Sequence, residues 1–176
     1  MRGLAEAAGV AASTVHRIEQ GAMQPTVYTL ARIAEAAGTR VHLEARPDYA
    51  ASVVGLAHEI RRALESHDLR DVVRMAAELS HRFLVADHDT RRRVVTARPP
   101  STGDPQWDAF LGALAEWLAS KGGVPVTAWA RRPERYLDHG WWITPMESMR
   151  AWEFAGSPMA FKQRGVYLHR ESLANT

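Results

Sequence analysis

Residues 4–21, LAEAAGVAASTVHRIEQG, predict two short helices joined by a tight turn. Apolar residues recur at helical spacing on one face of each helix, so that the two faces would pack together across the turn. Gly9 falls at the turn, where a positive φ is required and only glycine adopts it freely. Gly21 falls just beyond the second helix, where a left-handed residue commonly ends a helix. The apolar faces consist of Leu4, Ala5, Ala8, Val10, Val15 and Ile18.

The second predicted helix leaves a polar face free to enter a DNA major groove. Arg17 can pair bidentately with guanine, Ser13 can bond to several base edges, and Ala12 can touch a thymine methyl group. His16 and Gln20 lie where a side chain would reach phosphate or the rim of the groove. We therefore expect these five residues to form a DNA-binding face.

The same residues resemble the helix-turn-helix of the phage-repressor (Cro, lambda-repressor-like or XRE) family. The resemblance continues through Gln24 and Pro25 into the segment TVYTLARIAEAAG, and it covers about residues 1–38. It implies a sequence-specific transcriptional regulator that needs no cofactor and acts as a dimeric repressor on double-stranded DNA. The matching positions are Leu4, Ala5, Gly9, Val10, Ser13, Thr14, Val15, Arg17, Ile18, Glu19, Gly21, Leu30, Ile33, Ala34 and Gly38.

The chain departs from the family pattern in two ways. The family carries a full helix before the position of Leu4, whereas this sequence begins inside the family's second helix, so we expect the first helix to be missing. Such a truncated unit would expose apolar faces of the remaining helices. The family also begins its recognition helix with Ser or Thr, and here that position is Ala11. A Ser, Thr or Asp cap stabilises a helix by about 1 kcal/mol, so this helix begins without that contribution.

Residues 41–45 alternate between apolar and polar side chains, which predicts a short strand ended by Pro47. A lone strand needs a partner from another segment or another copy of the chain. The family resemblance implies pairing across a homodimer, and an irregular extended connector is the alternative. We assign residues 1–46 to a DNA-binding module with this strand.

Residues 47–98 predict a helical segment that could complete the dimer. Two apolar stripes indicate two helices, with a third, shorter helix over 89–95. The run Arg91, Arg92 and Arg93 could contact phosphate, but a solvated helix face is the commoner reason for such a run. The two stripes are Val53, Val54, Leu56, Ala57, Ile60 and Leu64, then Leu69, Val72, Val73, Ala76, Leu79 and Phe83.

The stretch ARPPSTGDP, residues 97–105, contains three prolines and a glycine and should form no regular structure. We assign 99–106 to a linker and 107–176 to a separate aromatic-rich module of α(+β) type, making the chain mostly α overall. The pair Trp141 and Trp142 could stack on nucleobases, but burial in a core is the interpretation we favour. All six tryptophans lie beyond the linker, at Trp107, Trp117, Trp129, Trp141, Trp142 and Trp152.

Within the last module, helices are predicted over 107–120 and 146–154, and a short strand over 166–168. Residues 133–173 resemble the C-terminal part of actinobacterial repressor-like proteins, some of which lie beside nucleotidyltransferase-like toxin genes. This implies an alternative function, an antitoxin that binds a toxin through its C-terminal module and represses its own operon. The matching positions are Pro133, Arg135, Tyr136, Leu137, Asp138, Trp141, Trp142, Ser157, Pro158, Ala160, Phe161, Arg164, Gly165, Val166 and Tyr167.

No constellation of residues predicts an enzyme or a metal site. His58 and Glu59 begin a zinc-peptidase motif, but the second histidine is replaced by Arg62. His81 and His88 lack a third ligand, and the chain has no cysteine for a disulfide or a thiolate zinc site. The 176 residues carry a formal net charge of +2, which permits nucleic-acid binding without requiring it. No signal peptide or membrane-spanning run is present, so we expect a cytoplasmic protein without a membrane partner.

Overall fold

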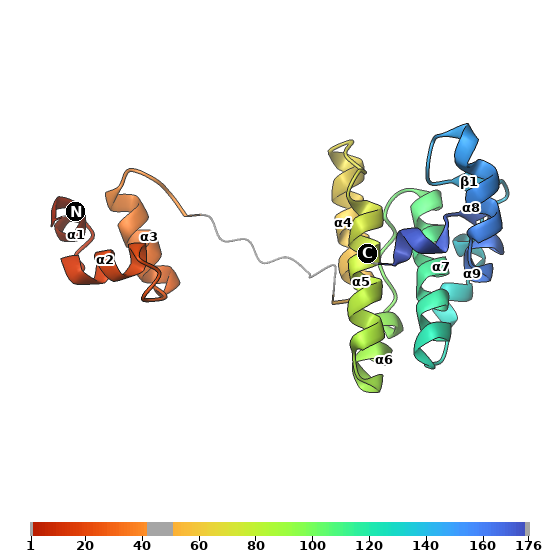
Figure 1. Ribbon diagram of the computed structural model, residues 1–176, viewed down its shortest axis with the longest axis horizontal. Coiled ribbons are helices and arrows are strands. Elements are labelled where there is room, and N and C mark those ends of the chain that lie inside the picture. The colour runs from red at the N-terminus through yellow and green to blue at the C-terminus, as the bar shows by residue number, and fades with distance from the viewer. Residues whose placement is uncertain (1, 42–50, 175–176) are drawn as a thin grey trace. The chain divides into compact units, whose positions relative to one another are not determined.

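The computed structural model describes residues 2–41 and 51–174 (Figure 1). The chain divides into two compact units, Met1–Ala45 and Arg46–Thr176. The described residues are mostly helical, with one two-stranded sheet, which confirms the predicted fold class. Most of the strand predicted over 41–45 lies outside the described residues.

The N-terminal unit contains three short helices that pack through a very small core. Ala5, Ala8 and Val15 are buried, and they come from the first two helices. The third helix buries no residue, and its Val27 and Tyr28 are exposed. The helices are α1 (Arg2–Ala7), α2 (Ala12–Glu19) and α3 (Val27–Ala36).

All three helices end in the same hydrogen-bonded motif, built on a glycine with positive φ. Gly9, Gly21 and Gly38 have φ values of 61°, 66° and 73°. After α2, for example, the N–H of Ala22 donates to the carbonyl of Arg17 at 2.8 Å, and the N–H of Gly21 donates to Ile18 at 3.0 Å. These paired bonds satisfy the last carbonyls of the helix. The predicted roles of the first two glycines are confirmed.

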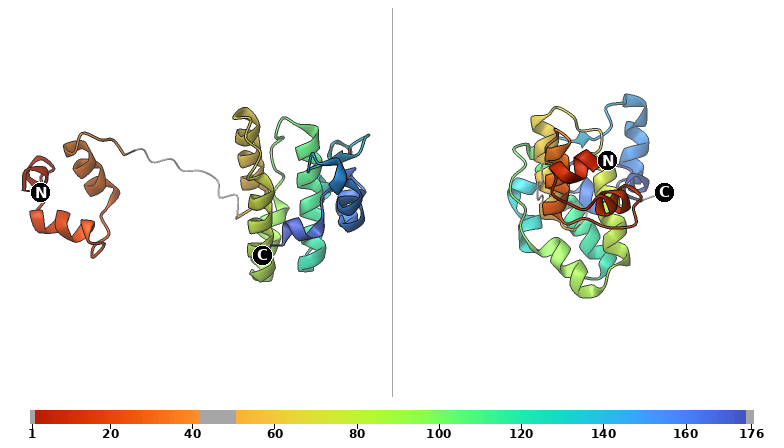
Figure 2. Two further views of the ribbon diagram at one scale, coloured as in Figure 1. Left: turned by 45° about the horizontal axis from the view of Figure 1, so that its top comes forward. Right: turned by 90° about the vertical axis from the view of Figure 1, so that its left-hand side faces the viewer.

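The C-terminal unit contains the elements α4 (Val53–Glu65), α5 (Val72–Val85), α6 (His88–Thr96), α7 (Pro105–Gly122), η1 (Ala128–Arg131), η2 (Pro133–Arg135), β1 (Trp141–Trp142), η3 (Glu147–Met149), α8 (Arg150–Gly156), α9 (Met159–Lys162), β2 (Val166–Tyr167) and η4 (Arg170–Leu173). It is built around one central helix, α7. This helix lies between α4, α5 and α6 on one side and the segment that carries α8 and α9 on the other (Figures 1 and 2).

The structure differs from the prediction of a separate module over 107–176. One continuous core runs from α4 to η4, and α7 contributes to it along its whole length. The segment before α7 has no regular structure, as predicted, but it is packed rather than free. Thr102 is buried, and its N–H donates to the Asp108 carboxylate at 2.8 Å. Composition predicts the absence of a helix at prolines and glycines, but it does not predict whether the chain there is solvated.

The sheet consists of β1 and β2, which pair in parallel with Trp141 opposite Val166 and Trp142 opposite Tyr167. Trp141 and Trp142 are both half-buried rather than core residues. The Trp141 ring meets Trp107 edge to face, with centroids 5.0 Å apart. Trp141 therefore joins the sheet to the core, while Trp142 packs on the Tyr167 ring, and neither tryptophan is fully enclosed.

Two arginines are buried in this unit with their charges compensated. Arg164 is fully buried. Its guanidinium donates to the Glu116 carboxylate at 2.5 Å and to the Ala130 carbonyl at 2.7 Å. Arg135 is buried beside Asp108, 3.4 Å away, and burial lowers the pKa of its guanidinium. Buried charges of this kind require such partners, because an unpaired ion in a core is strongly destabilising.

Candidate nucleic-acid interface

The polar face predicted for DNA lies on α2. The structure leaves Ala12, Ser13, His16, Arg17 and Gln20 exposed, while Val15 on the opposite face is buried. Within the described residues, no hydrogen bond or ion pair involves these five side chains, so their donors and acceptors remain available for a ligand. The arrangement gives one helix a continuous outward face with several hydrogen-bonding groups.

The beginning of α2 matches the expectation from sequence. Ala11 is the N-cap, with the extended conformation φ −65° and ψ 140°, and no side chain caps the helix. The N–H groups of Ala12 and Ser13 precede the first bonds inside the helix, which start with Thr14 donating to Ala11 at 2.9 Å. Backbone N–H groups at this end of a helix can donate to phosphate oxygens.

The position of α2 depends on the turn at Gly9 and on a neighbour from α3. A Cβ atom added at Gly9 would lie 2.0 Å from Nη2 of Arg32. The Arg32 guanidinium also lies over the Tyr28 ring, 5.6 Å from its centroid. Gly9 therefore supplies both the positive φ and the space into which Arg32 extends.

The start of α3 uses a cap that α2 lacks. The Thr26 hydroxyl accepts a hydrogen bond from the N–H of Thr29 at 3.1 Å, and so fixes the end of the loop that follows α2. Our sequence analysis did not identify this cap or the packing of Arg32 against Gly9. The Thr26 cap could have been found, because a threonine just before an apolar helical pattern is a common start signal. The contact of Arg32 is between helices and has no local signal.

The electrostatic support for DNA binding is local rather than global. Residues 1–45 contain four arginines and four glutamates, whose formal charges cancel. Arg17 is exposed on α2, and no carboxylate of the described residues forms an ion pair with it. A neutral unit gains little from the phosphate charge as a whole. Specific contacts from α2 would consequently carry most of the affinity of one unit.

The arginine run in the other unit does not form a uniform cationic face. Arg91 is half-buried and donates to the carbonyls of Phe83 at 3.1 Å and Leu84 at 2.6 Å. Arg91 therefore satisfies carbonyls at the end of α5, while Arg92 and Arg93 are exposed. In the part of the chain that the structure describes, no group of three His, Asp or Glu residues could hold a metal ion.

Comparison with known proteins supports the assignment of the N-terminal unit. A helix-turn-helix family model matches residues 1–42. No curated protein and no solved structure matches the chain. Among the described residues, no helix has the length and apolar character needed to cross a membrane. The chain thus carries a helix-turn-helix segment of the DNA-binding type, followed by a larger unit that the family model does not cover.

Proposed function

We propose that this protein is a sequence-specific transcriptional regulator that reads its operator with α2. The observation that carries the proposal is the exposed face of α2, whose five polar-face side chains have no partner among the described residues. This face belongs to the segment that matches the helix-turn-helix family. In such segments the second helix enters the major groove and presents its N-terminal residues to base edges.

Each residue of the face has a role that follows from its chemistry. Arg17 pairs with guanine, Ser13 donates to or accepts from a base edge, and Ala12 contacts a thymine methyl group. His16 and Gln20 contact phosphate or the rim of the groove, and they position the helix without reading sequence.

We further propose that the protein acts as a homodimeric repressor. Two copies would place α2 in successive major grooves about 34 Å apart, on a near-palindromic operator. The cancelling charges of residues 1–45 support this, because a single neutral unit would hold DNA weakly. Light scattering of the full chain at tens of micromolar should give the mass of a dimer, and a monomer would contradict this part of the proposal.

The central test replaces Arg17 with alanine after the operator has been selected from random DNA. Loss of one bidentate base contact should weaken operator binding by about 1–3 kcal/mol and relax the preference at one base pair. Arg40→Ala is the matched control, since Arg40 is exposed but lies outside α2. The control should keep the preference for the operator. If Arg17→Ala weakens binding to operator and random DNA equally, Arg17 contacts phosphate and does not read a base.

A second candidate function is that of an antitoxin which represses its own operon. Four large apolar side chains stay exposed on and beside α8 and α9, and exposed apolar patches often mark protein interfaces. Co-expression with the product of an adjacent gene should give a complex that Trp152→Ser and Phe154→Ser weaken. A complex that both variants leave intact would place the contact elsewhere. The four side chains are Met146, Trp152, Phe154 and Met159.

A further inference from the structure

A cavity of about 540 Å³ lies in the C-terminal unit, where the ends of α5 and α7 meet η4 and the turn before α9. This volume falls within the range of small-molecule sites, roughly 300–1,000 Å³. Its walls are mainly apolar. They include Leu84 from α5, Trp117 from α7, Pro158 from the turn and Leu173 from η4.

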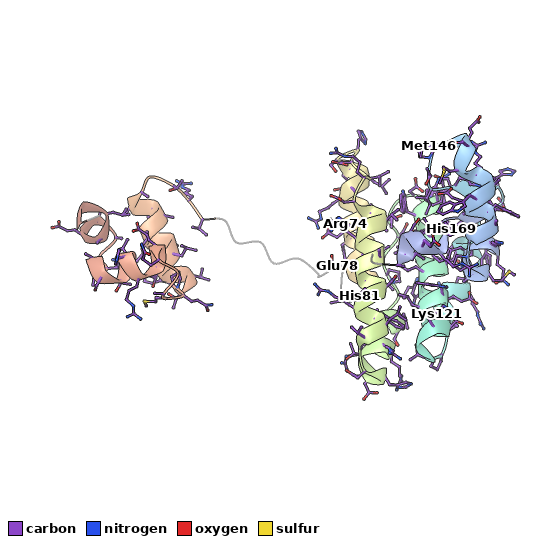
Figure 3. All side chains as sticks on the ribbon, in the orientation of Figure 1. Arg74, Glu78, His81, Lys121, Met146 and His169 are labelled. Carbon is purple, nitrogen blue, oxygen red and sulfur yellow. The ribbon has the colours of Figure 1, made fainter. Side chains whose placement is uncertain are left out.

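Two cations complete the wall of this cavity. Lys121 comes from the last turn of α7 (Figure 3), and Arg170 is the first residue of η4. Among the residues that the structure describes, none that lines the cavity is acidic. Neither cation forms an ion pair with a carboxylate of the described residues, and Arg170 uses only its Nε, which donates to the Gly156 carbonyl at 3.3 Å. Both side chains are exposed, so they place positive charge at the solvent-facing edge of an apolar space.

The hydroxyl in the wall is already committed to the fold. Ser157 donates to the Glu153 carbonyl at 2.7 Å and accepts a hydrogen bond from the N–H of Leu168 at 2.9 Å. It is buried, and its single O–H is already used, so it has no donor left for a carboxylate. The side-chain donors available to a bound molecule are thus the ammonium of Lys121 and the guanidinium of Arg170.

Two of the helices that form the cavity, α5 and α7, are fixed to each other. Arg91 donates to the carbonyls of Leu84 at 2.6 Å and Gly122 at 3.4 Å, and so ties the end of α5 to the end of α7. The two helices are closely packed there, because a Cβ atom on Gly122 would lie 2.5 Å from the Phe83 ring. A site that exists before binding spares the ligand the cost of ordering it.

We propose that this cavity binds a small amphipathic carboxylate, with its apolar body against Trp117 and Leu173 and its carboxylate on Arg170 and Lys121. A guanidinium can hold a carboxylate through two parallel hydrogen bonds, and an ammonium adds a point charge. The proposal goes beyond DNA binding and does not depend on it. It concerns only the C-terminal unit, so its test needs no DNA.

The lysine content of the chain permits a direct test. The sequence contains two lysines, Lys121 and Lys162. Lys162 does not line the cavity, and its ammonium lies 5.1 Å over the Phe154 ring. Reductive methylation with ¹³C-formaldehyde keeps the positive charge and gives each lysine and the N-terminal amine an NMR signal, and the Lys121→Arg and Lys162→Arg variants assign the two lysine signals.

The full chain is titrated with decanoate and 4-phenylbutyrate, with acetate and 4-phenylbutyramide as probes that lack the apolar body or the charge. At least one of the two larger carboxylates should shift the Lys121 signal to saturation and leave Lys162 unchanged, while acetate and the amide bind weakly or not at all. Lys121→Gln and Arg170→Gln should each weaken binding about 10- to 100-fold by calorimetry of unmodified protein, the loss of one charge-assisted contact. Lys162→Gln should bind as the parent does.

Several results would overturn the proposal. The absence of a saturable Lys121 shift with both larger carboxylates would show that the cavity does not take this class of ligand. Equal binding of the amide would show that the cations do not select a carboxylate, and equal binding of acetate would show that the apolar wall contributes nothing. Unaltered thermal melting of the two cavity variants ensures that weaker binding reflects the lost charge rather than unfolding.

Discussion

The N-terminal and C-terminal units differ in how much apolar surface they bury. Among the described residues of the N-terminal unit, the buried side chains are those of Ala5, Ala8 and Val15, which are all small. In the other unit, α7 alone buries eleven of its eighteen residues. Because hydrophobic stabilisation scales with the apolar area removed from water, the C-terminal unit has by far the larger reserve of stability.

This difference changes what a single residue can do in each unit. The N-terminal unit depends on turn geometry, since its three helix ends all use a glycine in the left-handed region. A loss of about 1–2 kcal/mol is a large fraction of the free energy of unfolding of so small a unit. The same loss is a smaller fraction for the C-terminal unit, which has a continuous core.

The largest expected effect comes from cutting the C-terminal unit at its proline-rich segment. A fragment of residues 107–176 should show no cooperative unfolding, because α7 would lose its contacts with α4, α5 and α6. A fragment of residues 46–176 should unfold in one transition. Both fragments contain all six tryptophans, so fluorescence follows the same probes in each. Cooperative melting of the shorter fragment would restore the division at the linker.

Local chemistry made the helices of both units predictable. The turn at Gly9, the end of α2 at Gly21 and the uncapped Ala11 follow from residue types at fixed offsets. The short helix predicted over 89–95 corresponds to α6, and the helix predicted over 107–120 corresponds to α7. Each of these features depends on side chains and backbone only a few residues apart.

Contacts between distant segments could not be predicted in the same way. Arg164 appears in the sequence as part of a turn, yet it is fully buried against Glu116, 48 residues earlier. Arg91 appears in a run of like charges, yet it bonds to the carbonyl of Gly122. The exposed face of α2 was predictable because amphipathic spacing defines both faces of a helix. The proposed base contacts depend on DNA and stay a prediction.

Gly9→Ala should destabilise the N-terminal unit and leave the stability of the C-terminal unit unchanged. Alanine at φ 61° costs about 1–2 kcal/mol, and its Cβ would also displace Arg32. We expect operator binding to be lost and the melting of the N-terminal helices, followed by circular dichroism, to move to lower temperature. The tryptophan transition should stay in place, because every tryptophan lies in the other unit.

Gly3→Ala is the matched control for that variant. Gly3 lies inside α1, and a Cβ atom there would meet nothing within 4 Å. Alanine in place of glycine stabilises a helix interior by about 0.5–1 kcal/mol, and because Gly3 lies in the first turn of α1 we expect a gain at or below the lower end of that range. Opposite signs for the two glycines would support a unit governed by turn geometry. If both variants behave alike, the positive φ of Gly9 does not limit stability.

Ala11→Ser should strengthen the N-terminal unit by about 1 kcal/mol. The extended backbone at Ala11 already suits a cap, and a serine hydroxyl could accept from the first free N–H groups of α2. Circular dichroism should show a higher melting temperature for the N-terminal helices and no change in tryptophan fluorescence. Ala22→Ser, at an exposed position outside α2, is the control and should have little effect. Equal effects from both serines would contradict a capping role.

The smallest expected effect tests whether the C-terminal unit also contains a strained helix end. His67 follows α4 with φ 54°, the position that glycine occupies at the three N-terminal helix ends. The N–H of Asp68 donates to the Ala63 carbonyl at 2.9 Å, so the same paired motif is present.

His67→Gly should relieve the steric cost of the Cβ atom and raise the free energy of unfolding by about 0.5–1 kcal/mol, measured by urea denaturation. The gain is limited because the His67 ring nitrogen Nδ1 also contacts the Leu64 carbonyl at 3.0 Å, and glycine gives up that contact. His67→Ala keeps the Cβ atom and loses the ring contact, so it should be less stable than the parent. A glycine variant that is no more stable than the alanine variant would show that the left-handed backbone at this position carries no strain.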